Sequence, residues 1–347
     1  MRHRPNADAE TAEKSGTINT GYITTIKRAL IYIDAAGVPV VRMNCGDRTD
    51  EHSAPSTGDP MTNPRFGGLV ALAFMAATTL PAQSQVAEIR DSYRVALDGT
   101  FAPHAMPKLS GGVEGFNVDL AQLIGERLGS EMTVDAAQFS GLIPALQAGT
   151  YDFLVAPVTV NQERSENLLF TEGFMDTNFA FVVPAGSEKR DGIEAFKGMT
   201  ISVNRGSAYH TYLDDHAAEY GWTVVPFGTN TDAVEAVATG RADANLSGAT
   251  VAAWAALQNP AVDLSYEIQT GLVWGLAFRL DDAATRNRVD LVLECLKTDG
   301  SLAALSEKWF GVTPAAGSTI VTPTPGFGVP GFPGYQEDAH EPSCDFS

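Results

Sequence analysis

Two hydrophobic patterns alternate along the chain from about residue 91 onwards. Short apolar runs are typical of buried strands, whereas apolar residues that recur every three or four positions are typical of amphipathic helices. The runs predict strands at 93–97, 132–136, 153–155, 200–203, 223–226 and 242–246. The longer spacing predicts helices at 117–128, 142–148, 208–220, 231–239, 249–257, 283–297 and 301–310. Because strands and helices alternate, we expect an α/β fold built on parallel sheets.

Two longer apolar runs interrupt the alternation, F-A-F-V-V-P at 179–184 and L-V-W-G-L-A-F at 272–278. We interpret them as strands by which the chain crosses between two lobes. Lobe 1 then comprises residues 91–180 and 277–311, and lobe 2 comprises residues 184–272. A chain that crosses twice forms a hinge, and closure of a hinge around a ligand is a known use of this arrangement.

The two ends of the chain differ from this middle part. Residues 61–84 contain Arg65, a short apolar stretch at 69–80 and small residues at the end, which is the layout of a secretory signal peptide. Since such a peptide opens a protein, we interpret residues 1–60 as a non-native upstream extension and expect export from the cytoplasm. Residues 312–347 are rich in Pro and Gly and are predicted to be a disordered tail.

Composition excludes some classes of function. The 347 residues are 44% hydrophobic, enough for a core and for two domains of ordinary size. With 23 basic and 42 acidic residues the net charge is −19, and nucleic acid and anionic lipid repel so acidic a protein. No apolar run reaches the ~18 residues that a membrane span requires. We therefore expect no nucleic-acid partner and no permanent membrane span.

The cysteines give no sign of a metal or redox site. Cys45, Cys295 and Cys344 form neither a C-x-x-C pair nor a cluster with histidine, so we expect no metal and no cofactor. Cys295 lies in an apolar helical pattern that favours a buried thiol. In an exported chain it could instead form a disulfide with Cys344, and the sequence leaves this open.

Nine short motifs follow one another along the middle of the chain. They are V-A-L-D-G-T-F-A-P (95–103), G-F-N-V-D-L (115–120), F-S-G-L-I-P-A-L (139–146), G-T-Y-D-F (149–153), V-T-V-N-Q-E-R (158–164), F-T-E-G-F (170–174), I-S-V-N-R-G-S (201–207), T-G-R-A-D-A (239–244) and K-T-D-G-S-L-A-A-L-S-E-K-W-F-G (297–311). In this order they resemble the bacterial extracellular solute-binding proteins of family 3, the polar-amino-acid branch. The resemblance covers about residues 93–311 and implies a two-lobed, type II periplasmic-binding-protein fold.

The resemblance also implies a function in transport rather than in catalysis. Such a protein would bind an amino acid or a related small carboxylate solute in the periplasm, which it reaches through the signal peptide that starts at Met61. Its cleft would close on the solute by hinge motion. As a monomer it would deliver the solute to the permease of an ABC importer in the inner membrane.

Arg164 is the most informative position of the predicted binding site. It follows a strand and a short turn, which places it at the carboxyl edge of a sheet, where α/β proteins bind ligands. Its guanidinium fork matches a carboxylate, and in the family the arginine of this motif binds the α-carboxylate of the ligand. The alternative is a surface ion pair with a nearby glutamate. Thr159 and Asn161 lie in the same turn and are expected to contact the ligand, as is the carbonyl of Pro157.

Other candidate residues come from the second lobe and from two aromatic positions. Ser207 and Ala208 lie where lobe 2 should present a helix N-terminus, whose free N–H groups favour an anion. Phe101 and Phe139 match family positions whose rings enclose the ligand side chain. An ordinary N-cap serine and two core phenylalanines are the alternatives.

One position departs from the family pattern. An aspartate that pairs with the ligand's ammonium is expected shortly after T-G-R-A-D-A, but Gly248 stands there. Either another carboxylate such as Glu172 or Asp176 replaces it, or the ligand is an organic acid or a betaine-like zwitterion, or the alignment is shifted by one residue. A quaternary nitrogen would suit an aromatic box.

Two rival functions remain. A few relatives with this fold are periplasmic dehydratases that act on prephenate or arogenate, of the cyclohexadienyl dehydratase kind. His104 is the one candidate acid for such chemistry, and it is otherwise interpreted as an exposed loop residue. A sensor module is the second rival, although no membrane helix or signalling domain follows residue 311.

Overall fold

The computed structural model describes residues 31–33, 39–41 and 86–346. The first two segments are β1 (Ile31–Ile33) and β2 (Pro39–Val41), which form an antiparallel pair. The signal peptide predicted at 61–84 lies outside the described residues, as does most of the predicted upstream extension. Residues 86–346 form two α/β lobes, and no helix among them is long and apolar enough to span a bilayer.

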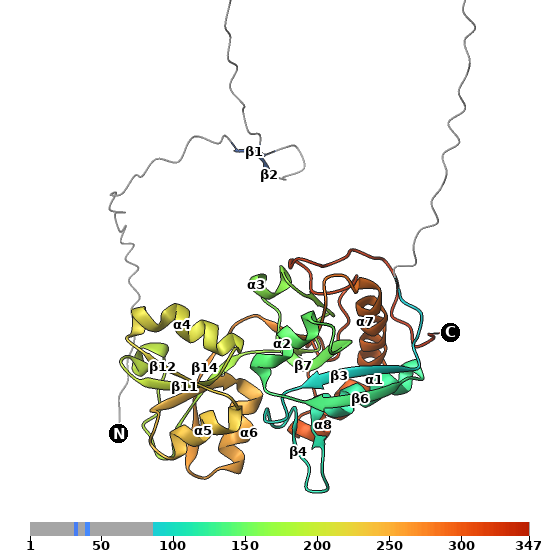
Figure 1. Ribbon diagram of the computed structural model, residues 1–347. Helices are drawn as coiled ribbons and strands as arrows, with labels where there is room; N and C mark the ends of the chain where they lie inside the picture. The colour runs from blue at the N-terminus through green and yellow to red at the C-terminus, as the bar shows by residue number, and fades with distance from the viewer. Residues whose placement is uncertain (1–30, 34–38, 42–85, 347) are drawn as a thin grey trace, which may run out of the picture. The chain divides into compact units, whose positions relative to one another are not determined.

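Lobe 1 is built on a six-stranded sheet in the order β6-β3-β7-β15-β8, with β9 also paired to β15. Figure 1 shows β6, β3 and β7 of this sheet with α1, α2 and α7 around them. β3 runs parallel to β6 and β7, whereas β15 is antiparallel to β7. The strands are β3 (Ser92–Leu97), β6 (Glu131–Ala136), β7 (Phe153–Thr159), β8 (Leu169–Phe170), β9 (Met175–Asp176) and β15 (Val273–Phe278). The helices are α1 (Phe116–Leu128), α2 (Phe139–Gln147), α3 (Gln162–Ser165), α7 (Ala283–Thr298) and α8 (Ser301–Phe310). A hairpin of β4 (Met106–Pro107) and β5 (Val113–Glu114) follows β3.

Lobe 2 is built on a five-stranded sheet in the order β12-β11-β13-β10-β14. β11 is parallel to β12 and β13, and β10 is antiparallel to both of its neighbours. The strands are β10 (Phe179–Pro184), β11 (Thr200–Asn204), β12 (Thr223–Phe227), β13 (Ala244–Gly248) and β14 (Val262–Ile268). The helices are α4 (Ala208–Tyr220), α5 (Asn230–Ala238), α6 (Ala249–Gln258) and a 3-10 turn, η1 (Ile193–Phe196). The sequence pattern missed β14, because its polar residues form no apolar run.

The chain crosses between the two sheets twice, as the sequence predicts, but through shorter segments. The apolar runs themselves are sheet strands: β10 belongs to lobe 2 and β15 to lobe 1. The crossings are therefore residues 177–178 and 269–272, and they lie against each other. Thr177 N donates to Leu272 O (2.9 Å), and Thr270 Oγ1 donates to Thr177 O (2.5 Å).

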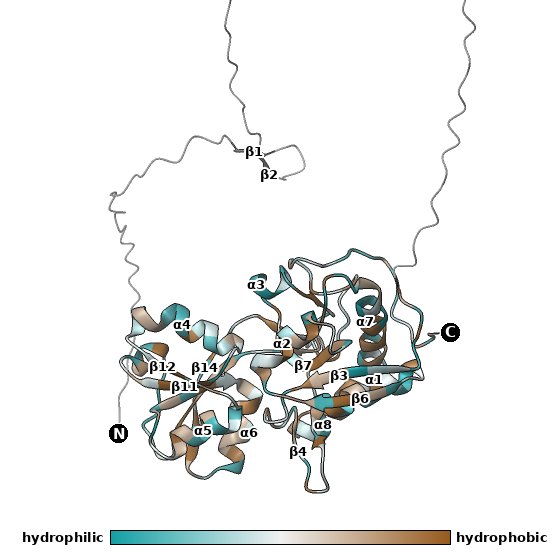
Figure 2. Ribbon diagram, in the orientation of Figure 1, coloured by the Kyte–Doolittle hydropathy of each residue, from teal (hydrophilic) through white to brown (hydrophobic). Residues whose placement is uncertain are grey.

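The hydrophobic core of each lobe lies between its sheet and its helices. Figure 2 shows hydrophobic and hydrophilic residues on strands and helices alike, and the buried hydrophobic ones form the core. β7 is buried along its whole length, as expected for a parallel strand covered on both faces. Stacked rings join the elements: Phe153 of β7 packs on Phe278 of β15, and Phe181 of β10 packs on Phe196 of η1.

Residues 312–346, predicted to be a disordered tail, instead pack along α7. Thr324 N donates a hydrogen bond to Glu172 Oε2 (2.7 Å). Gly328 N donates to Asp290 Oδ2, also at 2.7 Å. The prediction of disorder is therefore wrong for these residues: their Pro- and Gly-rich composition forms turns that bring backbone groups to the charged side chains of lobe 1.

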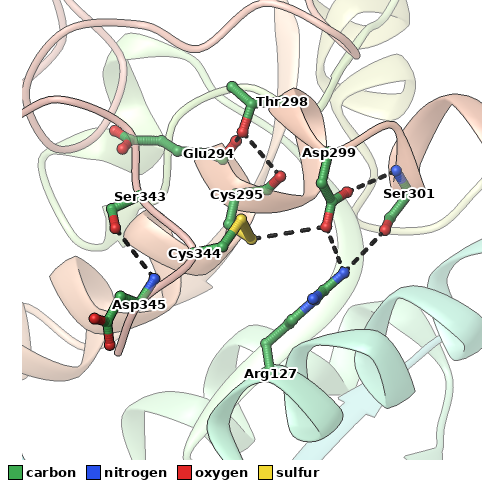
Figure 3. The surroundings of a disulfide bond; sticks show 9 residues. All are labelled: Arg127, Glu294, Cys295, Thr298, Asp299, Ser301, Ser343, Cys344 and Asp345. Carbon is green, nitrogen blue, oxygen red and sulfur yellow. Dashed lines mark hydrogen bonds and ion pairs between the residues drawn. A yellow bond between two sulfur atoms is a disulfide. The ribbon is translucent and has the colours of Figure 1, made fainter. Parts of the chain in front are cut away.

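A disulfide between Cys295 and Cys344 joins the end of the tail to α7, as Figure 3 shows. It settles the pairing that the sequence left open, and Cys295 is buried as half of this bond rather than as a free thiol. Beside it, Arg127 of α1 forms an ion pair with Asp299, at the end of α7. The tail is thus covalently part of lobe 1.

Candidate ligand-binding site

Four hydrogen bonds cross from lobe 1 to lobe 2 and hold the lobes against each other. They join Arg164 Nη2 to Gly206 O (3.1 Å), Asn204 Nδ2 to Asp98 Oδ2 (3.0 Å), Asn230 N to Thr100 Oγ1 (3.2 Å) and His104 Nε2 to Thr250 Oγ1 (2.8 Å). Since both lobes contribute, these contacts exist only when the lobes are close. The structure therefore has a closed interlobe cleft.

A cavity of about 310 Å³, part of it open to solvent, lies in this cleft. Seven of the eight predicted site residues line it: Phe101, Phe139, Pro157, Thr159, Arg164, Ser207 and Ala208. The eighth, Asn161, lies one step behind the cavity. Its Oδ1 accepts a hydrogen bond from the backbone N–H of Arg164 (2.9 Å) and caps α3. Asn161 therefore positions the arginine turn in this structure.

Three further residues line the cavity that the sequence did not assign to it: Asp98, Asn204 and Tyr209. Asp98 directly follows β3, and Asn204 ends β11. Thr159 likewise ends β7. Asp98, Asn204 and Thr159 thus lie at the carboxyl ends of parallel strands, the edge at which open α/β sheets bind ligands. That rule applied to every predicted strand would have found Asp98 and Asn204.

Arg164 reaches across the cleft from lobe 1. Its guanidinium donates to two backbone carbonyls, Thr159 O (3.3 Å) and Gly206 O (3.1 Å), and lies 5.6 Å from the centre of the Phe139 ring. Burial lowers the pKa of this guanidinium from its usual high value. Among residues 86–346 it forms no ion pair, so the alternative of a surface salt bridge with a glutamate does not hold in the described part of the chain.

The N-terminus of α4 lies beside this guanidinium. Ser207 is its N-cap and accepts a hydrogen bond from His210 N (3.1 Å), while its own hydroxyl donates to Asn204 O (2.7 Å). Gly206 has a φ of 76°, a left-handed conformation that a glycine adopts without strain. The first turn of α4 and its dipole add partial positive charge to the wall opposite Arg164.

Asp98 supplies the negative charge of the cavity. It is 3% exposed, and its Oδ1 accepts from Thr100 N (2.9 Å) and Thr100 Oγ1 (2.7 Å). Its Oδ2 accepts from Asn204 Nδ2 (3.0 Å), whereas Asn204 Oδ1 has no hydrogen-bond partner in the described structure. An acceptor oxygen and a carboxylate therefore lie together on one side of the cavity, a pair suited to a cationic donor.

Residues 93–312 match the bacterial extracellular solute-binding proteins, family 3. This chain belongs to that family. The resemblance carried by the nine sequence motifs is thereby confirmed.

Individual relatives agree with this assignment. The histidine-binding periplasmic protein of Escherichia coli K12 is 25% identical over 250 residues, covering 70% of this chain and 94% of that protein. An ancestral arginine-binding protein bound to arginine is similar with a TM-score of 0.62 and 31% identity, over 64% of this chain and 100% of its own. An ancestral amino-acid-binding protein, a precursor of cyclohexadienyl dehydratase, has a TM-score of 0.59 and 28% identity, and the match covers 64% of this chain and 96% of that protein. The predicted type II periplasmic-binding-protein fold is confirmed.

The position at which the family pattern predicts an aspartate is filled by neighbouring aromatic groups. Gly248 ends β13 and caps α6 with a φ of −64°, a conformation open to any residue. A Cβ there would lie 2.8 Å from Tyr209 Oη and 2.8 Å from the Trp274 ring. A longer side chain at position 248 therefore has no room while both rings are in place.

Neither carboxylate suggested as a replacement lies at the cavity. Glu172 is buried in an ion pair with Lys297 (2.8 Å), and Asp176 is exposed and accepts from Thr319 Oγ1 (2.5 Å). Both suggestions are wrong, because these side chains serve contacts with α7 and the tail. Among the residues that line the cavity, Asp98 is the only carboxylate.

His104, the candidate acid of the enzyme alternative, is buried rather than exposed. Its Nδ1 lies 2.9 Å from Asn117 Oδ1 and its Nε2 lies 2.8 Å from Thr250 Oγ1. Burial lowers its pKa to about 4, although the bond to Asn117 acts in the opposite direction. The ring does not line the cavity. In this structure it is a neutral interlobe contact.

Proposed function

We propose that this protein is the periplasmic binding component of an ABC importer and captures an amino acid or a closely related small zwitterion between its lobes. The observation that carries the proposal is one guanidinium and one carboxylate, Arg164 and Asp98, in a cavity whose other lining residues are uncharged. A ligand with one carboxylate and one cationic nitrogen complements both charges.

The carboxylate of the ligand binds at Arg164. Among the described residues this guanidinium donates hydrogen bonds to two carbonyls and forms no ion pair, so an incoming carboxylate supplies an ionic partner. The backbone N–H groups at the start of α4, next to Ser207 and Ala208, reach the same carboxylate from lobe 2. The hydroxyl of Thr159 adds a donor from lobe 1. One anionic group thus contacts both lobes.

The cationic nitrogen of the ligand binds at Asp98. The unpartnered Oδ1 of Asn204 accepts a second hydrogen bond, and the ring of Phe101 lies on the same wall. A plain organic acid would leave the Asp98 carboxylate buried without a cation, which is costly. Asp98 therefore supplies the charge that the glycine at position 248 cannot, and a zwitterion is favoured over an organic acid.

Binding to both lobes explains the use of a hinge. The two crossings at 177–178 and 269–272 are short, and they pair with each other, so the lobes rotate about one narrow region. A ligand that contacts residues of both lobes stabilises the closed arrangement over the open one. Presentation of the closed form to a permease follows the behaviour of the family, whose relatives include periplasmic amino-acid-binding proteins.

Calorimetry on one panel of solutes tests the proposal. The panel holds neutral, acidic and basic amino acids, glycine betaine and succinate, first screened by thermal shift because a ligand of the folded form raises its melting temperature. Arg164→Met should weaken the best ligand about 30-fold to 1,000-fold, since loss of one partner of a desolvated charge pair costs about 2–4 kcal/mol. The matched control is Arg205→Met, an exposed arginine whose side chain donates to Pro226 O and does not line the cavity. Unchanged affinity in Arg164→Met would refute this function.

A further inference from the structure

Tyr209 is fixed in the cleft by aromatic rings from both lobes. It is the second residue of α4 and is 3% exposed. Its ring is stacked nearly parallel to that of Phe101 in lobe 1, with centroids 6.4 Å apart and an interplanar angle of 15°. The ring of Phe179 on β10 meets it edge-on at 4.7 Å. The Tyr209 side chain therefore cannot swing aside without disturbing both lobes.

Tyr209 lines the cavity from lobe 2, and its hydroxyl lies next to Gly248. It occupies the space beside Gly248, where a Cβ would come within 2.8 Å of it, and Trp274 fills the remainder. Burial raises the pKa of this phenol, so the group is neutral at any physiological pH. The Trp274 indole N–H and the Thr177 hydroxyl are its polar neighbours, and neither has another hydrogen-bond partner among the described residues. Polar groups that a longer ligand could use are thus shut off by one aromatic side chain.

We infer that Tyr209 is the residue that limits ligand length in this protein and selects amino acids with short, uncharged side chains. The inference rests on the proposed function, since it names the class of amino acid that the same cavity takes. The ring supplies the size limit. The neutral hydroxyl supplies no charge for a second cationic group, and Asp98 already pairs with the first.

Three variants separate the ring from the hydroxyl. Tyr209→Phe keeps the ring and removes the hydroxyl, Tyr209→Leu keeps an apolar side chain of reduced size, and Tyr209→Ala opens the space toward Gly248 and Trp274. Each is titrated by calorimetry with glycine, alanine, valine, leucine, phenylalanine and arginine. Arg164→Met is titrated alongside. Melting temperatures without ligand report whether each variant is folded.

The wild type and Tyr209→Phe should both prefer the shortest side chains. In Tyr209→Ala the ratio of affinities for leucine over alanine should rise at least tenfold, with Tyr209→Leu in between. If folded Tyr209→Ala and Tyr209→Leu keep the wild-type ranking while Arg164→Met loses binding, the inference fails and the proposed function stands. If the wild type binds glycine betaine but no amino acid, this inference fails and the proposed function stands. If it binds none of the solutes of the panel, both fail.

Substitutions at positions 248 and 209, alone and combined, give a second readout that needs no ligand. Gly248→Ala should lower the melting temperature, because its new methyl group meets the Tyr209 hydroxyl and the Trp274 ring. Adding Tyr209→Phe to Gly248→Ala should recover part of that loss by removing one of the two contacts. An equal loss with and without the hydroxyl would show that Tyr209 does not fill this space, which overturns the inference.

Discussion

Two arginines of lobe 1, Arg286 and Arg164, lie in different surroundings. Arg286 on α7 is fully buried, and its guanidinium donates to groups of the protein itself: Asn287 Oδ1 (2.7 Å), Phe170 O (2.8 Å) and Gly334 O (3.1 Å). Asp290 lies four residues later on the same helix, and burial raises the pKa of its carboxyl to about 8, so it carries little negative charge at neutral pH. Arg164 is only partly buried and has two carbonyl partners and no carboxylate among the described residues.

The comparison shows how one residue type serves two purposes. A guanidinium whose partners all come from its own chain holds that chain together, here the tail against α7. A guanidinium that lines a cavity without an ionic partner keeps part of its binding capacity for a ligand. Removing the first should therefore cost stability, and removing the second should cost affinity.

Arg286→Met should have the largest effect on stability. It removes the bonds to Asn287, Phe170 and Gly334 and leaves buried acceptors without their donor, which typically costs about 1–3 kcal/mol for each such group. Urea unfolding should show this loss, whereas Arg164→Met should change the free energy of unfolding by less than about 1 kcal/mol. A comparable loss in both variants would erase the distinction between the two arginines.

The disulfide of the tail sharpens the same contrast. The double variant Cys295→Ser, Cys344→Ser removes a cross-link between residues that are 49 positions apart in the sequence. It should lower the free energy of unfolding by about 2–4 kcal/mol. Because neither cysteine lines the cavity, ligand affinity should stay within twofold of the wild type. A large drop in affinity would mean that the tail controls the cleft. That outcome would contradict the separation of structural and ligand-binding charges.

The fold was predictable from sequence wherever apolar periodicity carries the signal. Helix α4 was predicted with both ends correct, because its N-cap serine and the following glycine mark them. The tail was not predictable from composition. The tail packs on a row of buried charged or ionisable residues along α7, formed by Arg286, Asp290, Glu294 and Lys297. Because such a row on a helix usually faces solvent, the sequence gives no reason to expect a tail to cover it.

The site was predictable to the extent that it follows the family's motifs. The positions of Arg164, Thr159 and the start of α4 follow from strand ends and from a helix N-terminus, features that the sequence shows. Tyr209 was missed because it lies inside a helix and points back across the cleft, a direction set by packing on Phe101 and Phe179. No local pattern encodes such a contact.

Glu294 and His340 add a weaker, pH-dependent link between the tail and α7. Their side chains are 2.9 Å apart, and burial raises the pKa of Glu294 to about 7 despite the histidine. Burial opposes a rise in the pKa of His340, but Asp338 and Glu294 outweigh it. A folded-state pKa above its unfolded value gives stability at low pH that is lost as pH rises through the folded value. Both groups therefore favour the folded state at low pH, and the contribution of Glu294 is lost as pH rises through about 7.

His104 acts with the opposite sign, so the total pH dependence is not a clean measure of this link. Its pKa of about 4 lies below the unfolded value, and its contribution is lost as pH falls toward 4. The difference between the wild type and Glu294→Gln isolates the link to the tail, because His104 is common to both proteins.

Glu294→Gln should give the smallest effect of the series. The wild type should lose about 1–2 kcal/mol of stability relative to Glu294→Gln between pH 5 and pH 8, which corresponds to a shift of about one pKa unit after discounting for solvent at His340. Urea unfolding of both proteins at the two pH values measures it. A wild type that loses no stability relative to the variant as pH rises would show that the contact raises neither the pKa of Glu294 nor that of His340. The proposed pH-dependent link between the tail and α7 would then be absent.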